Sequence, residues 1–115
     1  MEREAEVLDL RALRLAVGCS QVKLATFLGV DPSTIGRWEY RCSQGYKLAS
    51  AVLHPWCRSK LIELSQVAAV APAQLRDLLQ RAQGFDLTAL DELRTLAAAA
   101  REQARLQQAG QSDQH

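Results

Sequence analysis

The sequence predicts an all-α protein, and three observations predict it. Residues 20–39 read as two short helices joined by a glycine turn, residues 55–71 place apolar side chains at helical spacing, and leucines after residue 72 recur every three or four positions. A chain of 115 residues with 48% hydrophobic residues can form one compact domain with an appendage. We expect a first domain over residues 1–70, a helical pair over 71–106 and a flexible tail over 107–115.

The first of the two short helices has a narrow apolar face. Leu24, Ala25 and Leu28 lie on that face, and the small alanine lets a second helix cross closely. Gly29 ends this helix, because glycine adopts positive φ without a Cβ penalty. Val30 then places an apolar side chain between the two helices. The connection is therefore short and fixed.

The second short helix starts with a good capping sequence. Asp31 suits the N-cap position and Pro32 the first helical position, and we expect the helix to run to about Tyr40. Ile35 and Trp38 point inward on a helical wheel. The residues that point outward make a small, mostly polar face with one long cation, and they are Pro32, Ser33, Gly36, Arg37 and Tyr40.

This arrangement resembles the helix-turn-helix domain of the Cro and phage-repressor type, the xenobiotic-response-element family, with a lambda-repressor-like fold. The resemblance covers about residues 7 to 41. It implies a protein that sets the second short helix, the reading helix, into the major groove of double-stranded DNA. The motif residues are Leu10-Arg11-x-x-Arg14, Ser20-Gln21-x-x-Leu24-Ala25-x-x-Leu28-Gly29-Val30 and Ser33-Thr34-Ile35-x-Arg37-Trp38-Glu39.

The resemblance implies a role for each matching position. Gln21 would contact a phosphate and brace the reading helix. Pro32, Ser33 and Arg37 occupy positions that meet base edges, although a proline offers only apolar contact. Arg14 and Glu39 would form a buried ion pair between the first helix and the reading helix.

Two further positions depart from the family pattern. Gly36 is unusually small for a helix interior, where glycine costs about 1 kcal/mol relative to alanine. Either the chain tolerates that cost or DNA approaches too closely for a Cβ. Phe27 is apolar where the family is commonly polar and exposed.

Charge is distributed unevenly along the chain. The formal net charge is only +1, but residues 31–60 hold five Lys and Arg against two acids, an excess of three. Basic charge on and just after the reading helix lies where phosphates would be. We therefore add Arg41 to the candidate DNA contacts, together with Lys23 on the first motif helix.

The cysteines predict no disulfide framework and no metal centre. Cys19, Cys42 and Cys57 contain no C-x-x-C pair, and free cysteine usually behaves as a small buried residue. His54 lies three residues before Cys57, so a zinc site is an alternative, but a turn into the next helix at Pro55 explains the histidine more simply. We expect no metal and no cofactor, and leave redox control through the thiols open.

Residues 41–54 are the least readable part of the chain, with some helical spacing at Leu48, Val52 and Leu53. The next helix, from about Pro55 to the Ala71-Pro72 step, is expected to close the first domain. Its inward residues are predicted to be Trp56, Leu61, Leu64 and Val67 or Ala68.

Two more helices are predicted beyond this domain. One starts at Pro72, buries Leu75, Leu78, Leu79 and Ala82, and stops at Gln83-Gly84; the last begins at Asp86. Apolar residues in the last helix recur at alternating steps of three and four, which is coiled-coil spacing. We expect self-association through Leu90, Leu93, Ala97 and Ala100, with the stripe continuing to Ala104. The alternative is that the stripe packs back on the first domain.

The function that follows is DNA-binding transcription regulation. The sequence contains no phosphate loop and no nucleophile-base set, so we do not expect an enzyme. The N-terminus is acidic rather than a leader, and we expect a cytoplasmic location. We expect a repressor that acts as a homodimer on a palindromic operator. The alternative is an antitoxin-like or adaptor module that binds a protein partner through its C-terminal helices, and exposure of Phe27 and Tyr40 would favour it.

Overall fold

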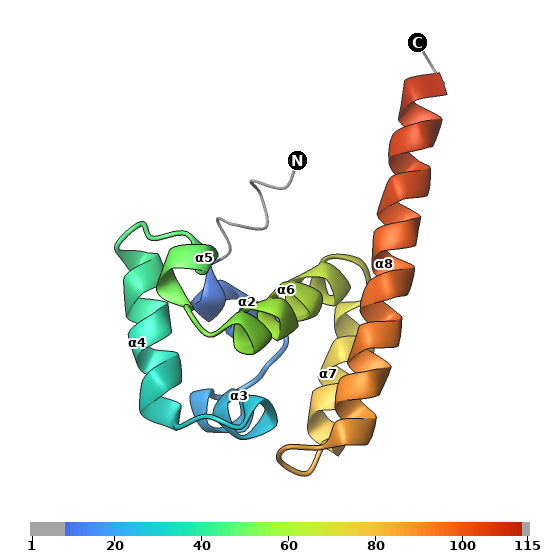
Figure 1. The fold of residues 1–115 in the computed structure, drawn as a ribbon. Helices are drawn as coiled ribbons and strands as arrows, with labels where there is room; N and C mark the ends of the chain where they lie inside the picture. The colour runs from blue at the N-terminus through green and yellow to red at the C-terminus, as the bar shows by residue number, and fades with distance from the viewer. Residues whose placement is uncertain (1–8, 114–115) are drawn as a thin grey trace.

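A computed structural model describes residues 9–113 of the chain, and within that range it contains only helices. The helices are connected by short turns. The expected all-α class is therefore confirmed. In chain order the seven helices are α2 (Leu10–Ala16), α3 (Gln21–Leu28), α4 (Pro32–Ser43), α5 (Leu48–Ala51), α6 (Pro55–Val70), α7 (Pro72–Arg81) and α8 (Leu87–Asp113) (Figure 1).

Side-chain caps fix where several helices begin. Asp9 accepts a hydrogen bond from the backbone N–H of Ala12, and Ser20 and Asp31 cap α3 and α4 in the same way. His54 caps α6, its Nδ1 lying 3.4 Å from the backbone N of Cys57. As expected, the chain turns into the next helix at His54, which is the N-cap of α6.

The glycine turn between α3 and α4 has the predicted geometry. Gly29 adopts φ +74, in the left-handed region, and its N–H and that of Val30 bond carbonyls in the last turn of α3. Val30 is half-buried against the core. The crossing of α3 and α4 is thus set by a turn that allows little variation.

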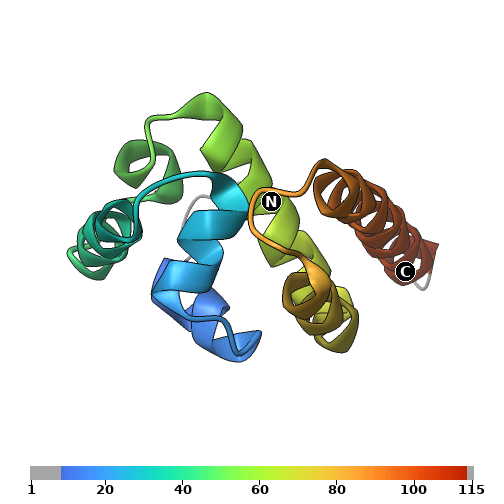
Figure 2. The ribbon, with the colours of Figure 1, turned by 90° about the horizontal axis from the view of Figure 1, so that it is seen from below.

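Helix α6 lies between the two halves of the molecule. Figures 1 and 2 show α2 to α5 on one side of it and α7 with α8 on the other. Buried side chains from both sides form a single hydrophobic cluster, with Leu13 and Leu24 on one side and Leu75 and Leu79 on the other. A boundary at residue 70 therefore does not separate two cores.

The stripe predicted for dimerisation is buried within the chain itself. Leu93 and Ala97 are 0% exposed, and Leu90 and Ala100 are 5% and 6% exposed. Helix α8 packs along α6, which also contacts α2. These four residues are not available to a second copy in this conformation, so the expected dimer interface is corrected.

Two details of the C-terminal half also differ from expectation. Trp56 was expected to point inward but is 37% exposed, because the next residue, Cys57, occupies the inward position one turn before Leu61. The expected tail from residue 107 continues as helix to Asp113, since it contains glutamine and alanine and no proline. Residues 114–115 and the acidic start of the chain lie outside the described range.

Candidate DNA-binding surface

The exposed face of α4 carries the residues predicted to read DNA. Pro32, Ser33, Arg37 and Tyr40 are exposed, and Gly36 is half-buried between them. Ile35 and Trp38 of the same helix are buried, at 0% and 7% exposure. The helix is three turns long and ends at Ser43 rather than at about Tyr40, so the face is longer than predicted.

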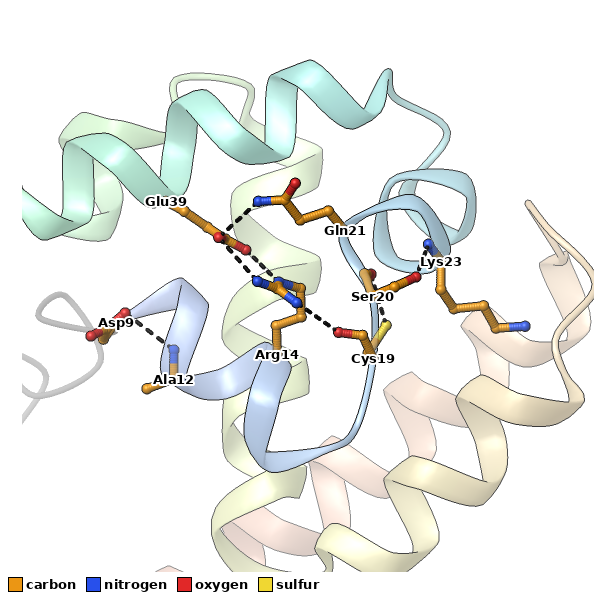
Figure 3. Close-up of polar contacts among 8 residues, drawn as sticks. All are labelled: Asp9, Ala12, Arg14, Cys19, Ser20, Gln21, Lys23 and Glu39. Carbon is orange, nitrogen blue, oxygen red and sulfur yellow. Dashed lines mark hydrogen bonds and ion pairs between the residues drawn. The ribbon is translucent and has the colours of Figure 1, made fainter.

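Three elements meet behind this face at the carboxylate of Glu39. Arg14 of α2 donates from Nε to one oxygen at 2.6 Å and from Nη2 to the other at 3.3 Å. Gln21 of α3 donates from Nε2 at 3.0 Å (Figure 3). The same arginine donates from Nη1 to the carbonyl of Cys19 at 3.1 Å. The expected ion pair between Arg14 and Glu39 is thus formed.

Burial makes this network a structural one. The Glu39 side chain is 7% exposed and that of Arg14 is 13% exposed. The hydrogen bond with Glu39 raises the pKa of the Arg14 guanidinium above its usual value. A buried carboxylate with three donors holds the positions of α2, α3 and α4, so the orientation of the reading face is fixed before any ligand binds.

The surroundings of Gly36 do not require a glycine. Its backbone is ordinary helix, and a Cβ built on it would lie 4.0 Å from Nε2 of Gln21, an ordinary contact distance. No other atom outside its own helix and chain neighbours comes within 4 Å. The reason for this glycine is therefore either tolerance of its cost or close approach by a bound molecule.

Ser33 and Arg37 make only local contacts. The backbone N and the Oγ of Ser33 both donate to Asp31 Oδ1, at 2.9 and 2.8 Å. These two hydrogen bonds lower the pKa of the Asp31 carboxyl below its usual value. Arg37 donates to the hydroxyl of Thr34 at 3.3 Å, and its guanidinium is exposed. A ligand could replace the hydroxyl contact of Ser33 with Asp31 or the contact of Arg37 with Thr34.

Lys23 and Arg41 are engaged within the chain. The ammonium of Lys23 donates to the carbonyl of Ala82 at 2.8 Å, and Figure 3 shows it pointing away from Glu39. Arg41 donates to the carbonyl of Ala51 at 3.3 Å. The lysine thus joins α3 to the end of α7 and does not lie with the reading residues, so we remove it from the candidate DNA contacts.

The connection between α7 and α8 covers part of the helix-turn-helix motif, which the sequence did not indicate. A Cβ placed on Gly29 would lie 3.1 Å from Cδ1 of Phe85, and one on Gly84 would lie 3.2 Å from Cγ2 of Thr26. Phe85 also lies beside Trp56, with ring centroids 5.8 Å apart. The C-terminal helices therefore support the turn that orients α4.

The thiols and the other possible metal ligands are dispersed over the part of the chain that the structure describes. Between residues 9 and 113, no three His, Cys, Asp or Glu side chains gather as metal ligands would. Cys19 and Cys57 are buried and Cys42 is half-buried, and burial raises the pKa of all three thiols. Over the same range no helix has the length and apolar character needed to span a bilayer.

Comparison with known proteins identifies the segment that carries the reading face. Residues 10–44, which contain α2, α3 and α4, match the protein family described as Helix-turn-helix, and this segment is a helix-turn-helix domain of the Cro and C1 type. A domain of this class supports a DNA-binding regulator. Searches of curated proteins and of solved structures returned no match. The matched segment ends before α5, so α5 to α8 lie outside it.

Proposed function

We propose that this protein is a sequence-specific, DNA-binding transcriptional repressor that acts as a homodimer on a palindromic operator. The observation that carries the proposal is the exposed face of α4, which is held by the buried carboxylate of Glu39. A helix held rigidly with a polar face outward is what the major groove admits. A cytoplasmic location, with access to DNA, is part of this proposal.

Three exposed residues, and Gln21 behind them, have a proposed chemical role on this surface. The guanidinium of Arg37 can donate two hydrogen bonds to N7 and O6 of a guanine, a contact that discriminates by about 1–3 kcal/mol. The hydroxyl of Ser33 can donate to a base or phosphate, and Pro32 can contact a thymine methyl group. Gln21 stands at the start of α3, where backbone N–H groups favour a phosphate.

Two considerations support repression by a homodimer. A single reading helix makes few base contacts, and two copies on two half-sites multiply them. Within the described residues the helix-turn-helix and the helices that support it form one core, which leaves no separate effector domain in that range. Occlusion of a promoter needs no such domain.

The experiment that tests this proposal is selection of duplex DNA from a random pool, at about 150 mM salt to weaken non-specific attraction. We expect enrichment of an inverted repeat with guanines placed for Arg37. Enrichment of a single, unrepeated site would support DNA reading and contradict the homodimer. A folded protein that enriches no sequence would contradict sequence-specific binding.

The second candidate is a protein-interaction module. Tyr40 is 65% exposed at the edge of the reading face, which suits a protein partner as well as a phosphate. Phe27 is 1% exposed and buried in the core, so only one of the two aromatic residues that would favour this alternative is accessible. Tyr40→Ala, assayed for DNA affinity, separates the two candidates. A loss of affinity supports DNA reading, because an adaptor surface needs no DNA at all.

A further inference from the structure

The second half of α8 extends beyond the body of the molecule (Figure 1). The first half packs along α6, whereas every residue from 101 to 109 is exposed. An isolated helical segment of this length is marginally stable in water, and most helices in proteins depend on packing of one face. The exposed segment continues a helix that is packed at its other end, so a partner that covered one of its faces would stabilise it further.

A second stripe of residues runs along the uncovered side of α8. Leu96, Ala99, Gln103, Leu106 and Gly110 recur at steps of three and four, and they lie beside the buried stripe of Leu93 and Ala97 rather than on it. Leu96 is half-buried, Ala99 is exposed and Leu106 is 58% exposed. The spacing is that of a helix that packs against another helix.

An uncharged groove lies at the base of this stripe. Its volume is about 240 Å³, and it is formed where α6 ends, α7 begins and α8 passes both. Val70 at its rim is 40% exposed. None of the residues that line it is charged, and they are Val67, Val70, Ala71, Gln74, Leu96, Ala99, Ala100 and Gln103.

We propose that the occupant of this groove is the C-terminal part of α8 from a second copy of the chain. Helix α8 carries both one wall of the groove and the exposed Leu106, so a twofold axis near Gln103 would place each Leu106 over the partner's exposed Ala99. The same axis pairs Leu96 with Gly110, a large residue with a small one. It also brings the two Gln103 amides together, and a polar pair of this kind specifies the register of two helices.

Charge supports this occupant. Residues 106–112 contain no charged side chain, and neither does the groove that would receive them. Three charged residues of this part of α8 lie off the stripe: Glu102 pairs with Arg105 of the same chain, and Arg101 contacts Gln66. An uncharged segment on an uncharged groove loses no ionic solvation on binding.

This interface rests on the homodimer of the proposed function, and the test is self-association without DNA, so that its failure is distinguishable from a failure to read DNA. Sedimentation velocity over a concentration series is expected to show a monomer–dimer equilibrium for the unmodified chain. The substitution Leu106→Glu is expected to raise the dissociation constant at least about tenfold, because a charge replaces an apolar residue at the centre of a contact. The matched control is Leu87→Glu, which changes a leucine 73% exposed at the other end of α8 and should leave the constant unchanged.

Cross-linking tests the axis itself. Gln103→Cys is expected to form a disulfide-linked dimer under mild oxidation, above the background of the unmodified chain, and Gln108→Cys, which lies off the stripe, is expected not to. A chain that stays monomeric throughout the series contradicts the proposal. So does a Leu106→Glu variant that dimerises as well as the unmodified chain, or equal cross-linking by the two cysteine variants. Circular dichroism of each variant checks that α8 remains folded.

Discussion

The guanidinium of Arg14 and the carboxylate of Glu39, 25 residues apart in sequence, form a largely buried ion pair between α2 and α4, with 2.6 Å between Nε and Oε2. Gln21 completes the coordination of the carboxylate from a third helix. The side chain that positions the reading helix is therefore an acid, which would be a poor direct ligand for DNA. Its effect on affinity is expected to come through the fold.

Glu39→Ala is expected to destabilise the protein by about 3–5 kcal/mol, because it leaves a mostly buried guanidinium without its counter-charge. Urea unfolding monitored by tryptophan fluorescence measures the free energy of unfolding. The control is Glu92→Ala, which breaks an exposed ion pair with Arg81 and should cost far less. An equal loss in the free energy of unfolding for the two variants would show that the buried ion pair stabilises the protein no more than an exposed one.

Arg37→Ala is expected to weaken binding to the selected operator by about tenfold to a hundredfold, the discrimination of one bidentate contact with guanine. The side chain is exposed and makes one local hydrogen bond, so thermal stability should not change. Fluorescence anisotropy with labelled operator measures the affinity. Arg94→Ala removes another exposed cation, on α8, and should leave affinity intact. The assignment of the reading face fails if both variants bind alike.

Gly36→Ala is expected to raise the free energy of unfolding by up to about 1 kcal/mol, because alanine is the better helix former and the nearest atom outside the helix is 4.0 Å away. Gly29→Ala is the contrasting variant: it should destabilise, since φ is +74 and Phe85 lies 3.1 Å from the new Cβ. Thermal denaturation compares the two. Operator affinity of Gly36→Ala then decides whether DNA approaches this position: a loss indicates close approach, and no change indicates tolerance.

Leu93→Ala is expected to cost about 2–5 kcal/mol, the usual range for a cavity at a fully buried leucine. The reason is that α8 completes the core that α6 shares with the helix-turn-helix domain. Leu87→Ala, on the same helix at 73% exposure, should be nearly neutral. Differential scanning calorimetry also tests cooperativity: two separate transitions would mean that α7 and α8 unfold independently of the rest.

Acid is expected to weaken the start of α4. The folded-state pKa of Asp31 is lowered, first by the backbone hydrogen bond from Ser33 and then by its hydroxyl. The contribution of this cap is complete above the ordinary pKa of an aspartate, and it is lost as the pH falls through the lowered value. Asp31→Asn keeps an N-cap without a titrating group, so its stability should change less with pH in this acid range. Unfolding midpoints measured down the acid limb check this.

Local features of the sequence predicted the helix-turn-helix well. The Asp31 cap, the positive φ of Gly29 and the inward direction of Ile35 depend on residues within a few positions of one another, and the structure has all three. The same is true of Leu75, Leu78 and Leu79, whose spacing predicts the buried face of α7. Such features follow from helical geometry and backbone preference alone.

The partners of those faces were decided by tertiary structure. The spacing of Leu90, Leu93 and Ala97 predicts an apolar stripe, but a stripe does not specify whether α6 or a second chain covers it, and here α6 does. Likewise nothing near Lys23 in sequence indicates the carbonyl of Ala82, which lies 59 positions away. The sequence by itself determined the elements and their apolar faces because those depend on neighbours along one helix. The packing of helices decided which face meets which, because that choice depends on the shape and area of surfaces that exist only once the chain is folded.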